Sequence, residues 1–293
     1  MEPQDRTYKA ADGTELPVRV WPAVRYGPTR AGAVAPPRAA IVYLHGIQSH
    51  SGWYEASSRC LAAAGIAVYQ IERRGSGRDV AHERGHVDRA ETWIDDVTAA
   101  AKLARRETGL EGVHLLGVSW GGKLALAAAA DRSHLYRSLI LAAPGILPRI
   151  DAALTTKMRV AACLLAGRPR TRFPVPLDDP ALFTANPDRR QFIADDPLAL
   201  REVTARFLYE SRRLDRLARR AARSMRLPVF LALAETDLII DNPATRRLVE
   251  SMPSRDRRVV TYPESHHTLE FDPDPSRYFA DLEDWIRHVE GEP

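Results

Sequence analysis

A serine between small residues provides the first side chain that could do chemistry. Residues 117–121 read GVSWG and match the pattern G-x-S-x-G. An apolar stretch at 113–116 precedes them and a helix-like stretch follows. Small residues on both sides of a serine allow a sharp turn from strand to helix, which exposes the hydroxyl. We therefore predict that Ser119 is a nucleophile. The alternative is a tight turn in which the serine only caps a helix.

A serine hydroxyl is a weak nucleophile until a base removes its proton. Two adjacent histidines, His266 and His267, follow the apolar stretch 258–262 near the end of the chain. Either histidine could be the base, and both could instead be ordinary loop residues. Spacing alone does not separate them.

The imidazole of such a base needs a carboxylate that fixes its tautomer and stabilises its charged form. Asp237 lies just beyond the apolar stretch 229–233, and we predict that it supplies this carboxylate. Glu235 and Asp241 are the alternatives. Whichever of them does not act on the histidine would cap a helix or remain a surface charge.

Attack on a carbonyl also requires donors for the oxygen that becomes negative. We expect one donor to be the N–H of Trp120, which follows the nucleophile. The other is expected in the loop after the apolar stretch 39–44, at the N–H of Ile47. His45 in the same loop is interpreted as structural, and the bulky Trp120 as a residue that shapes the pocket.

Two other polar groups have simpler interpretations. Residues 72–77 place glycines after a strand but match neither phosphate-binding pattern, so we predict a tight turn beside the site. His82, His86 and Asp88 lack a second ligand cluster, so we interpret them as a polar loop. We expect neither a metal nor an organic cofactor.

The elements that must position these residues alternate along the chain. Short apolar stretches typical of strands buried on both faces lie at 39–44, 66–71, 113–116, 139–142, 229–233 and 258–262. Helical stretches lie at 54–64, 91–107, 121–131, 243–250 and 275–289. A hairpin around Asp12-Gly13 and a loop at 22–38 come first. This alternation predicts an α/β protein with a mostly parallel, doubly wound sheet.

The alternation stops between residues 148 and 227. This segment is helical and basic, with 17 Arg and Lys against 9 Asp and Glu. We predict a helical cap there, inserted into a catalytic domain that comprises residues 1–147 and 228–293. Its charge could attract anionic substrates or allow peripheral contact with a membrane, or it could be a solvated surface.

Composition limits the remaining possibilities. Of the 293 residues, 45% are hydrophobic and 27% are charged, which is ordinary for a soluble globular protein. No motif indicates nucleic-acid binding, and no apolar run approaches the ~20 residues of a membrane span. The first residues lack the pattern of a secretory signal, and Cys60 and Cys163 fit no disulfide framework, so we expect reduced core cysteines and a cytoplasmic location.

Taken together, these residues resemble the α/β-hydrolase superfamily, and within it the monoacylglycerol lipase and lysophospholipase-like group, also described as serine aminopeptidase-like. The similarity runs over nearly the whole chain and includes Asp12-Gly13, His45-Gly46, residues 74–77, residues 117–121, Asp237 and His267. The order serine, aspartate, histidine is that of this fold. The resemblance implies that His267, followed by Thr-Leu-Glu-Phe, is the base, and that Ile47 and Trp120 are the oxyanion donors. Glu72 departs from the aspartate that is usual there.

The resemblance implies hydrolysis of a small carboxylic acyl ester whose acyl chain lies under the cap. A thioesterase, an amidase or peptidase, or an acyltransferase would use the same three side chains, and fold alone does not separate them. A non-catalytic ligand-binding protein on the same fold is a further alternative. The sequence does not predict the oligomeric state.

Overall fold

The N-terminal residues form the antiparallel hairpin that the sequence predicts. The computed structural model describes residues 2–27, 30–34 and 36–292. Strands β1 (Gln4–Lys9) and β2 (Glu15–Trp21) pair in antiparallel register on either side of the predicted turn. This hairpin forms one edge of the main sheet.

The main sheet has eight strands in the order β1-β2-β6-β5-β7-β8-β11-β12. Its parallel part comprises β6 (Ile66–Ile71), β5 (Ala39–Leu44), β7 (Val113–Val118), β8 (Tyr136–Ala142), β11 (Val229–Ala234) and β12 (Arg257–Tyr262). Every residue of β5, β6, β7 and β11 is buried. Strands covered on both faces are apolar throughout, so the predicted strands are confirmed.

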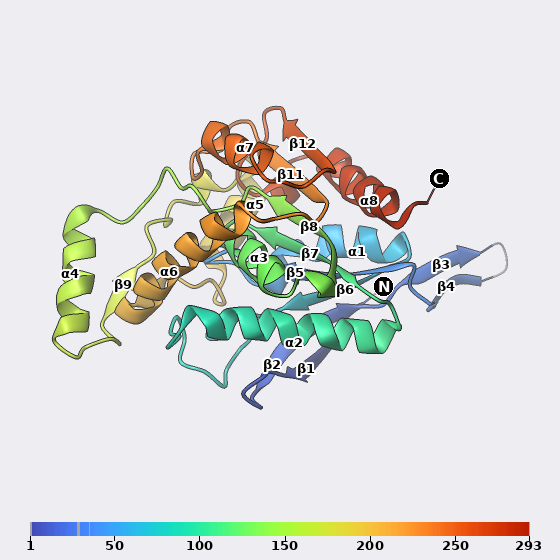
Figure 1. Ribbon diagram of the computed structural model, residues 1–293. Helices are drawn as coiled ribbons and strands as arrows, with labels where there is room; N and C mark the ends of the chain where they lie inside the picture. The colour runs from blue at the N-terminus through green and yellow to red at the C-terminus, as the bar shows by residue number, and fades with distance from the viewer. Residues whose placement is uncertain (1, 28–29, 35, 293) are drawn as a thin grey trace.

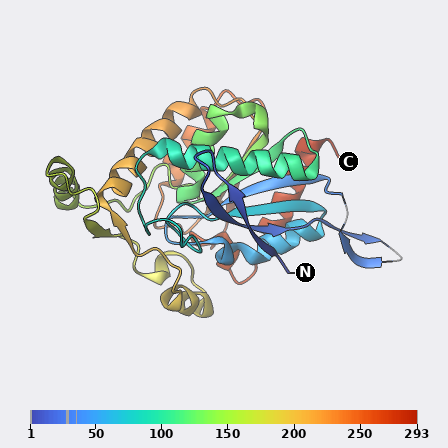
Figure 2. The ribbon, with the colours of Figure 1, turned by 90° about the horizontal axis from the view of Figure 1, so that it is seen from below.

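Helices cover both faces of this sheet (Figures 1 and 2). Helices α2 (Ala90–Thr108) and α3 (Trp120–Asp131) pack together on one face, and α1 (Glu55–Ala63) and α8 (Ser276–Glu290) on the other. Helix α7 (Asn242–Glu250) packs against β11. The structure is therefore the predicted doubly wound α/β arrangement, with the carboxyl ends of the parallel strands at one edge.

The predicted loop at 22–38 is wrong in part. Strands β3 (Val24–Gly27) and β4 (Arg30–Val34) form an antiparallel ribbon of their own, at the opposite end of the molecule from α4 (Figure 1). Residues 28, 29 and 35 lie outside the described part of the chain. Strand β3 also packs against α1. The segment is rich in Pro, Gly and Ala, which are depleted in strands, so its composition gave no strand pattern.

The segment between β8 and β11 contains α4 (Leu154–Leu165), β9 (Arg172–Pro174), α5 (Pro187–Asp195), β10 (Glu202–Thr204) and α6 (Ala205–Ala222). Helix α6 packs along α3, whereas α4 lies outermost and buries none of its residues (Figure 1). The short β9 and β10 pair with each other, which the sequence did not predict. Single 3-10 turns occur at Ser51–Tyr54, Ser133–Leu135, Pro180–Leu182 and Leu269–Phe271.

Three further predictions concern membrane-spanning helices, metal ligands and the two cysteines. Within residues 2–27, 30–34 and 36–292, no helix is long and apolar enough to cross a membrane. The same residues contain no group of three or more His, Cys, Asp or Glu side chains that could hold a metal. Cys60 and Cys163 are free, as expected, but both are half-buried rather than part of the core.

Candidate active site

The turn from β7 into α3 forces Ser119 into a conformation that few residues adopt. Ser119 has φ 52° and ψ −121°, which is strained for a residue with a side chain. A Cβ on Gly117 would lie 2.4 Å from the carbonyl oxygen of Gly121, and one on Gly121 would lie 2.5 Å from that of Leu44. Glycine is therefore required on both sides of the serine, and the turn holds the serine at the carboxyl edge of the sheet.

A buried hydrogen bond joins the other two predicted side chains. Asp237 follows β11 and His267 follows β12, and these neighbouring parallel strands bring the two together. His267 Nδ1 lies 2.8 Å from Asp237 Oδ2, and the other oxygen, Oδ1, accepts the N–H groups of Ile239 and Ile240 at 2.8 and 3.1 Å. The carboxylate thus fixes the proton on Nδ1.

The opposite nitrogen of this ring is free. His267 is only 2% exposed, and its Nε2 is buried without a hydrogen-bond partner among the described residues. A buried nitrogen without a partner costs free energy of folding, so its presence calls for an explanation such as a role in the chemistry. With the proton on Nδ1, Nε2 carries a lone pair that can accept a proton. No hydrogen bond joins it to Ser119 in the described structure, which is common before substrate binds.

The rival residues have other partners. His266 lies 3.3 Å from the hydroxyl of Thr236 and does not contact Asp237. A carboxylate oxygen of Glu235 accepts the N–H of Glu264 at 3.0 Å. Asp241 caps α7 by accepting the N–H of Ala244 at 2.9 Å. The geometry therefore favours His267 and Asp237 over these alternatives.

The peptide between Gly46 and Ile47 is held in one orientation. Its carbonyl oxygen, on Gly46, accepts hydrogen bonds of 2.8 Å from both His45 Nδ1 and the guanidinium of Arg73. In a trans peptide the N–H points away from the carbonyl. The N–H of Ile47 therefore faces the other side, and it donates to no acceptor in the described part of the chain.

The peptide between Ser119 and Trp120 has the same construction. The carbonyl oxygen of Ser119 accepts the N–H groups of Gly122 and Gly145 at 2.8 and 2.7 Å. The N–H of Trp120, at the start of α3, is directed away from that oxygen and has no acceptor among the described residues. A Cβ on Gly46 would lie 3.4 Å from Ser119 Cβ, so the two peptides lie close together. Two unpaired donors thus flank the serine.

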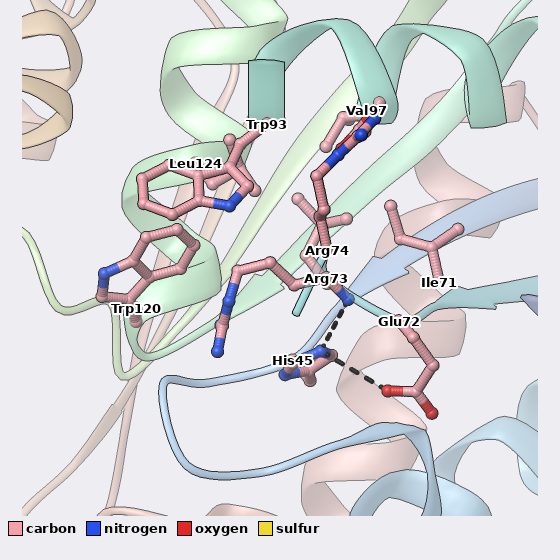
Figure 3. Close-up of a pocket in the computed structure, with 11 residues that line it drawn as sticks. His45, Ile71, Glu72, Arg73, Arg74, Trp93, Val97, Trp120 and Leu124 are labelled. Carbon is pink, nitrogen blue, oxygen red and sulfur yellow. Dashed lines mark hydrogen bonds and ion pairs between the residues drawn. The ribbon is translucent and has the colours of Figure 1, made fainter. Parts of the chain in front are cut away.

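Arg73 ties this edge of the site together (Figure 3). Its guanidinium donates to the carbonyl oxygens of Gly46 and Ile47 at 2.8 and 2.7 Å and lies 4.6 Å from the centre of the Trp120 ring. Burial lowers the pKa of Arg73 to about 9, so it stays charged at neutral pH. Its backbone N–H donates to His45 Nε2 at 3.0 Å.

That last bond fixes the state of His45. Because Nε2 accepts from Arg73, the proton lies on Nδ1, which donates to Gly46. Burial lowers the pKa of His45, which keeps the ring neutral although a carboxylate oxygen of Glu72 lies 3.6 Å away. Figure 3 shows the contacts of His45 with the backbone nitrogen of Arg73 and with Glu72. Both ring nitrogens of His45 are thus hydrogen-bonded, which agrees with a structural role, and residues 72–77 include a turn beside the site.

A cavity of about 380 Å³ opens in front of Ser119. Ile47 and Trp120 line it together with Ser119, and most of its wall is apolar. Apolar residues from 148–227 form the outer part, among them Val160, Leu164, Val175, Leu177 and Leu208. A chain of methylene groups fits such a wall, and the ester at its end would reach Ser119.

Comparison with known protein families identifies the family of this chain. Residues 35–274 match the family described as serine aminopeptidase, S33. The chain belongs to this family. Its members include hydrolases of the α/β-hydrolase fold, and the doubly wound sheet with a strained serine turn described above is that fold.

Individual relatives have names that agree with this assignment. The chain is 27% identical to human "Monoglyceride lipase" over 261 residues, which cover 88% of this chain and 82% of the relative. The solved monoacylglycerol lipase of Paleococcus ferrophilus superposes with a TM-score of 0.79 at 23% identity, covering 94% of this chain and 100% of the other. The monoglyceride lipase of Saccharomyces cerevisiae superposes with a TM-score of 0.83 at 19% identity, covering 99% and 96%.

Sequence reasoning missed two charged residues at the site, Arg73 and Lys123. Lys123 lies in α3, where residues 120–129 are all buried, and it lines the cavity. A single lysine inside an otherwise apolar helix is a signal that could have identified it. Residues 79–88, which include His82 and His86, form a loop, as predicted. His82 contacts the neighbouring Asp79, and His86 contacts Thr204 at the end of β10.

Proposed function

We propose that this protein hydrolyses carboxylic esters through an acyl-enzyme on Ser119. One observation carries the proposal: a buried His267 that is bound to Asp237 through Nδ1 and has a free Nε2 at the edge of the sheet where the strained serine lies. Membership of the serine aminopeptidase S33 family and similarity to monoglyceride lipases support ester hydrolysis.

In the proposed reaction, His267 Nε2 removes the proton from Ser119 as its oxygen attacks the ester carbonyl. The N–H groups of Ile47 and Trp120 stabilise the resulting oxyanion. Collapse of this intermediate breaks the bond to the alcohol, which takes the proton from His267. Water then attacks the acyl-enzyme by the same route and releases the acid, which restores Ser119.

The substrate class follows from the cavity and the relatives together. A mostly apolar wall of about 380 Å³ suits an acyl chain, and residues 148–227 would act as a cap that covers it. We propose monoacylglycerol-like or other acyl monoesters as substrates. Transfer to a second alcohol, or cleavage of thioesters or amides, would use the same groups.

Turnover of matched substrates tests this proposal. We expect hydrolysis of a monoacylglycerol and of the corresponding p-nitrophenyl ester, with the amide of the same acyl group cleaved far more slowly. Ser119→Ala should lower kcat by about 10⁶-fold, and the remainder reflects only the oxyanion donors and substrate binding. If the amide is the best substrate, or if an added alcohol diverts most of the acyl group, the assignment to ester hydrolysis is wrong.

A further inference from the structure

Five charged side chains form a continuous chain of ion pairs along one wall of the cavity. Lys123 Nζ lies 2.6 Å from Asp215, and Lys157 Nζ lies 2.7 Å from Asp151. Arg212 joins the two pairs, since its guanidinium contacts Asp151 and lies 3.6 Å from the other oxygen of Asp215. We name this set the cavity ion-pair chain: Lys157, Asp151, Arg212, Asp215 and Lys123.

The cavity ion-pair chain has an excess of positive charge. It alternates in sign, begins and ends with a lysine, and contains all the charged side chains that line the cavity. Its net charge is therefore one positive unit. Arg73 adds further positive charge beside it, since its guanidinium and Lys123 lie 4.6 and 5.4 Å from the Trp120 ring.

Lys123 is the member closest to the nucleophile along the chain. It lies four residues after Ser119 in α3, about one helical turn or ~6 Å along the axis. Its ammonium donates to Asp215 and to Ser211, at 2.6 and 3.0 Å. A lysine ammonium has three N–H groups, so one remains without an acceptor among the described residues.

Stability alone does not explain a charged pair at this buried position. Lys123 is 6% exposed and Asp215 is 6% exposed, and burial lowers the pKa of the Lys123 ammonium. A well-packed apolar pair would often be as stable as a buried ion pair. The pair nevertheless lines the space where the substrate would lie rather than the closed core.

We propose that the cavity ion-pair chain selects esters that carry a second, negatively charged group, a carboxylate or a phosphate. This inference rests on the proposed ester hydrolysis and adds the charge of the substrate to it. The anion would bind near the free N–H of Lys123, with the ester carbonyl at Ser119 and the aliphatic part against the apolar wall. A charge-assisted contact of this kind in a largely buried site is stronger than a neutral one.

Two pairs of substrates test the proposal and separate the sources of the anion. The p-nitrophenyl monoester of adipic acid and p-nitrophenyl hexanoate have the same acyl length and differ by a terminal carboxylate. A monoacylglycerol phosphate and its monoacylglycerol differ by a phosphate on the alcohol side. The quantity measured is kcat/KM for the anionic ester divided by that for the neutral one.

Three variants change the charge of the wall in known directions. Lys123→Met should lower this ratio about tenfold for at least one pair, since hydrogen bonds to charged groups contribute roughly that factor. Lys157→Met, at a half-exposed position, should lower the ratio several-fold. Asp151→Asn removes a negative charge and should raise it. Lys102→Met, on exposed α2 surface outside the cavity, is the matched control and should leave it unchanged.

A structural role would give another pattern. If Lys123→Met lowers turnover of both esters equally and the ratio is the same in all variants, the cavity ion-pair chain only holds α3 to α6 and the proposal is wrong. Calorimetric binding of monomethyl adipate and methyl hexanoate to Ser119→Ala gives the same comparison without turnover. If the wild type hydrolyses no ester, the proposed function is wrong. The ratio of the affinities for monomethyl adipate and methyl hexanoate would still test whether the cavity prefers an anion.

Discussion

At the scale of the residue, the site depends on atoms that are held in place but left unpaired. His267 Nε2 and the N–H groups of Ile47 and Trp120 are all without partners in the described part of the chain. The other polar atoms of the same groups are hydrogen-bonded. His267 Nδ1 is bound to Asp237, and the carbonyl oxygens of the two peptides, on Gly46 and Ser119, accept hydrogen bonds. Preorganised groups of this kind need no rearrangement during the reaction, which is where enzymes gain most of their rate.

Asp237→Asn tests the role assigned to the carboxylate. An amide in this place would donate to Nδ1 and shift the imidazole proton to Nε2, where the base must be free. We expect kcat to fall by about 10⁴-fold with little change in KM. Steady-state kinetics on a p-nitrophenyl ester gives both values.

The matched control is Glu235→Gln, two residues before, whose carboxylate accepts only a backbone N–H. This variant should retain wild-type kcat. A loss of less than tenfold in Asp237→Asn, or a comparable loss in Glu235→Gln, would contradict the assignment of Asp237.

At the scale of the element, Glu270 joins the loop that holds His267 to helix α1, which is 213 residues away in the sequence. One oxygen of this buried carboxyl accepts the N–H of Ser57 in α1 at 2.8 Å, and the other has no partner among the described residues. Burial raises the pKa of Glu270 to about 7. The folded protein therefore prefers the protonated carboxyl more strongly than the unfolded chain does.

The raised pKa makes stability depend on pH. Between its ordinary pKa of 4.5 and about 7, Glu270 is protonated in the folded protein and ionised in the unfolded chain. Its contribution is fully present below the lower value and is lost as the pH rises through the upper one, a change of about 3 kcal/mol. Glu270→Gln removes this titration and should gain about 2 to 3 kcal/mol relative to wild type between about pH 5 and about pH 8.

Urea unfolding of both proteins at the two pH values measures this change. The control is Glu264→Gln, at an exposed position in the same loop. Its free energy of unfolding should differ from that of the wild type by the same amount at both pH values. Equal stability differences for Glu270→Gln at the two pH values would show that the carboxyl titrates alike in the folded and unfolded chain.

The sequence predicted elements best where local pattern and burial agree. Strands such as β5 and β11 are apolar in every position because helices cover both faces, so their pattern is visible without the fold. The ribbon β3–β4 and the pair β9–β10 were missed, since short strands held by backbone bonds need no apolar alternation.

In the site, too, residues in a local pattern were predicted and residues brought together by packing were not. The serine turn has a local pattern, and the ends of neighbouring parallel strands explain why Asp237 and His267 meet. Spacing could not choose between His266 and His267, because that choice depends on which ring reaches Asp237 across the sheet. Lys123 and Asp215 are 92 residues apart, and only the packing of α3 against α6 brings them together.

At the scale of the whole molecule, the proposed function places the chemistry at the main sheet, and residues 148–227 would surround the substrate. Ser119, Asp237, His267 and the N–H groups of Ile47 and Trp120 all lie just beyond the carboxyl ends of strands of the main sheet. The outer wall of the cavity comes from α4, α6 and the chain between them. Such a division lets the chemistry stay fixed while the outer wall selects the substrate.

The central claim is that Ser119 is an activated nucleophile. The measurement that tests it most directly is the intact mass of the protein after exposure to a fluorophosphonate, for the wild type and for Ser119→Ala. We expect one adduct in the wild type and none in the variant, because only a serine with a base and an oxyanion site reacts at a useful rate. A folded wild type that stays unlabelled, or an adduct that persists in Ser119→Ala, would contradict it.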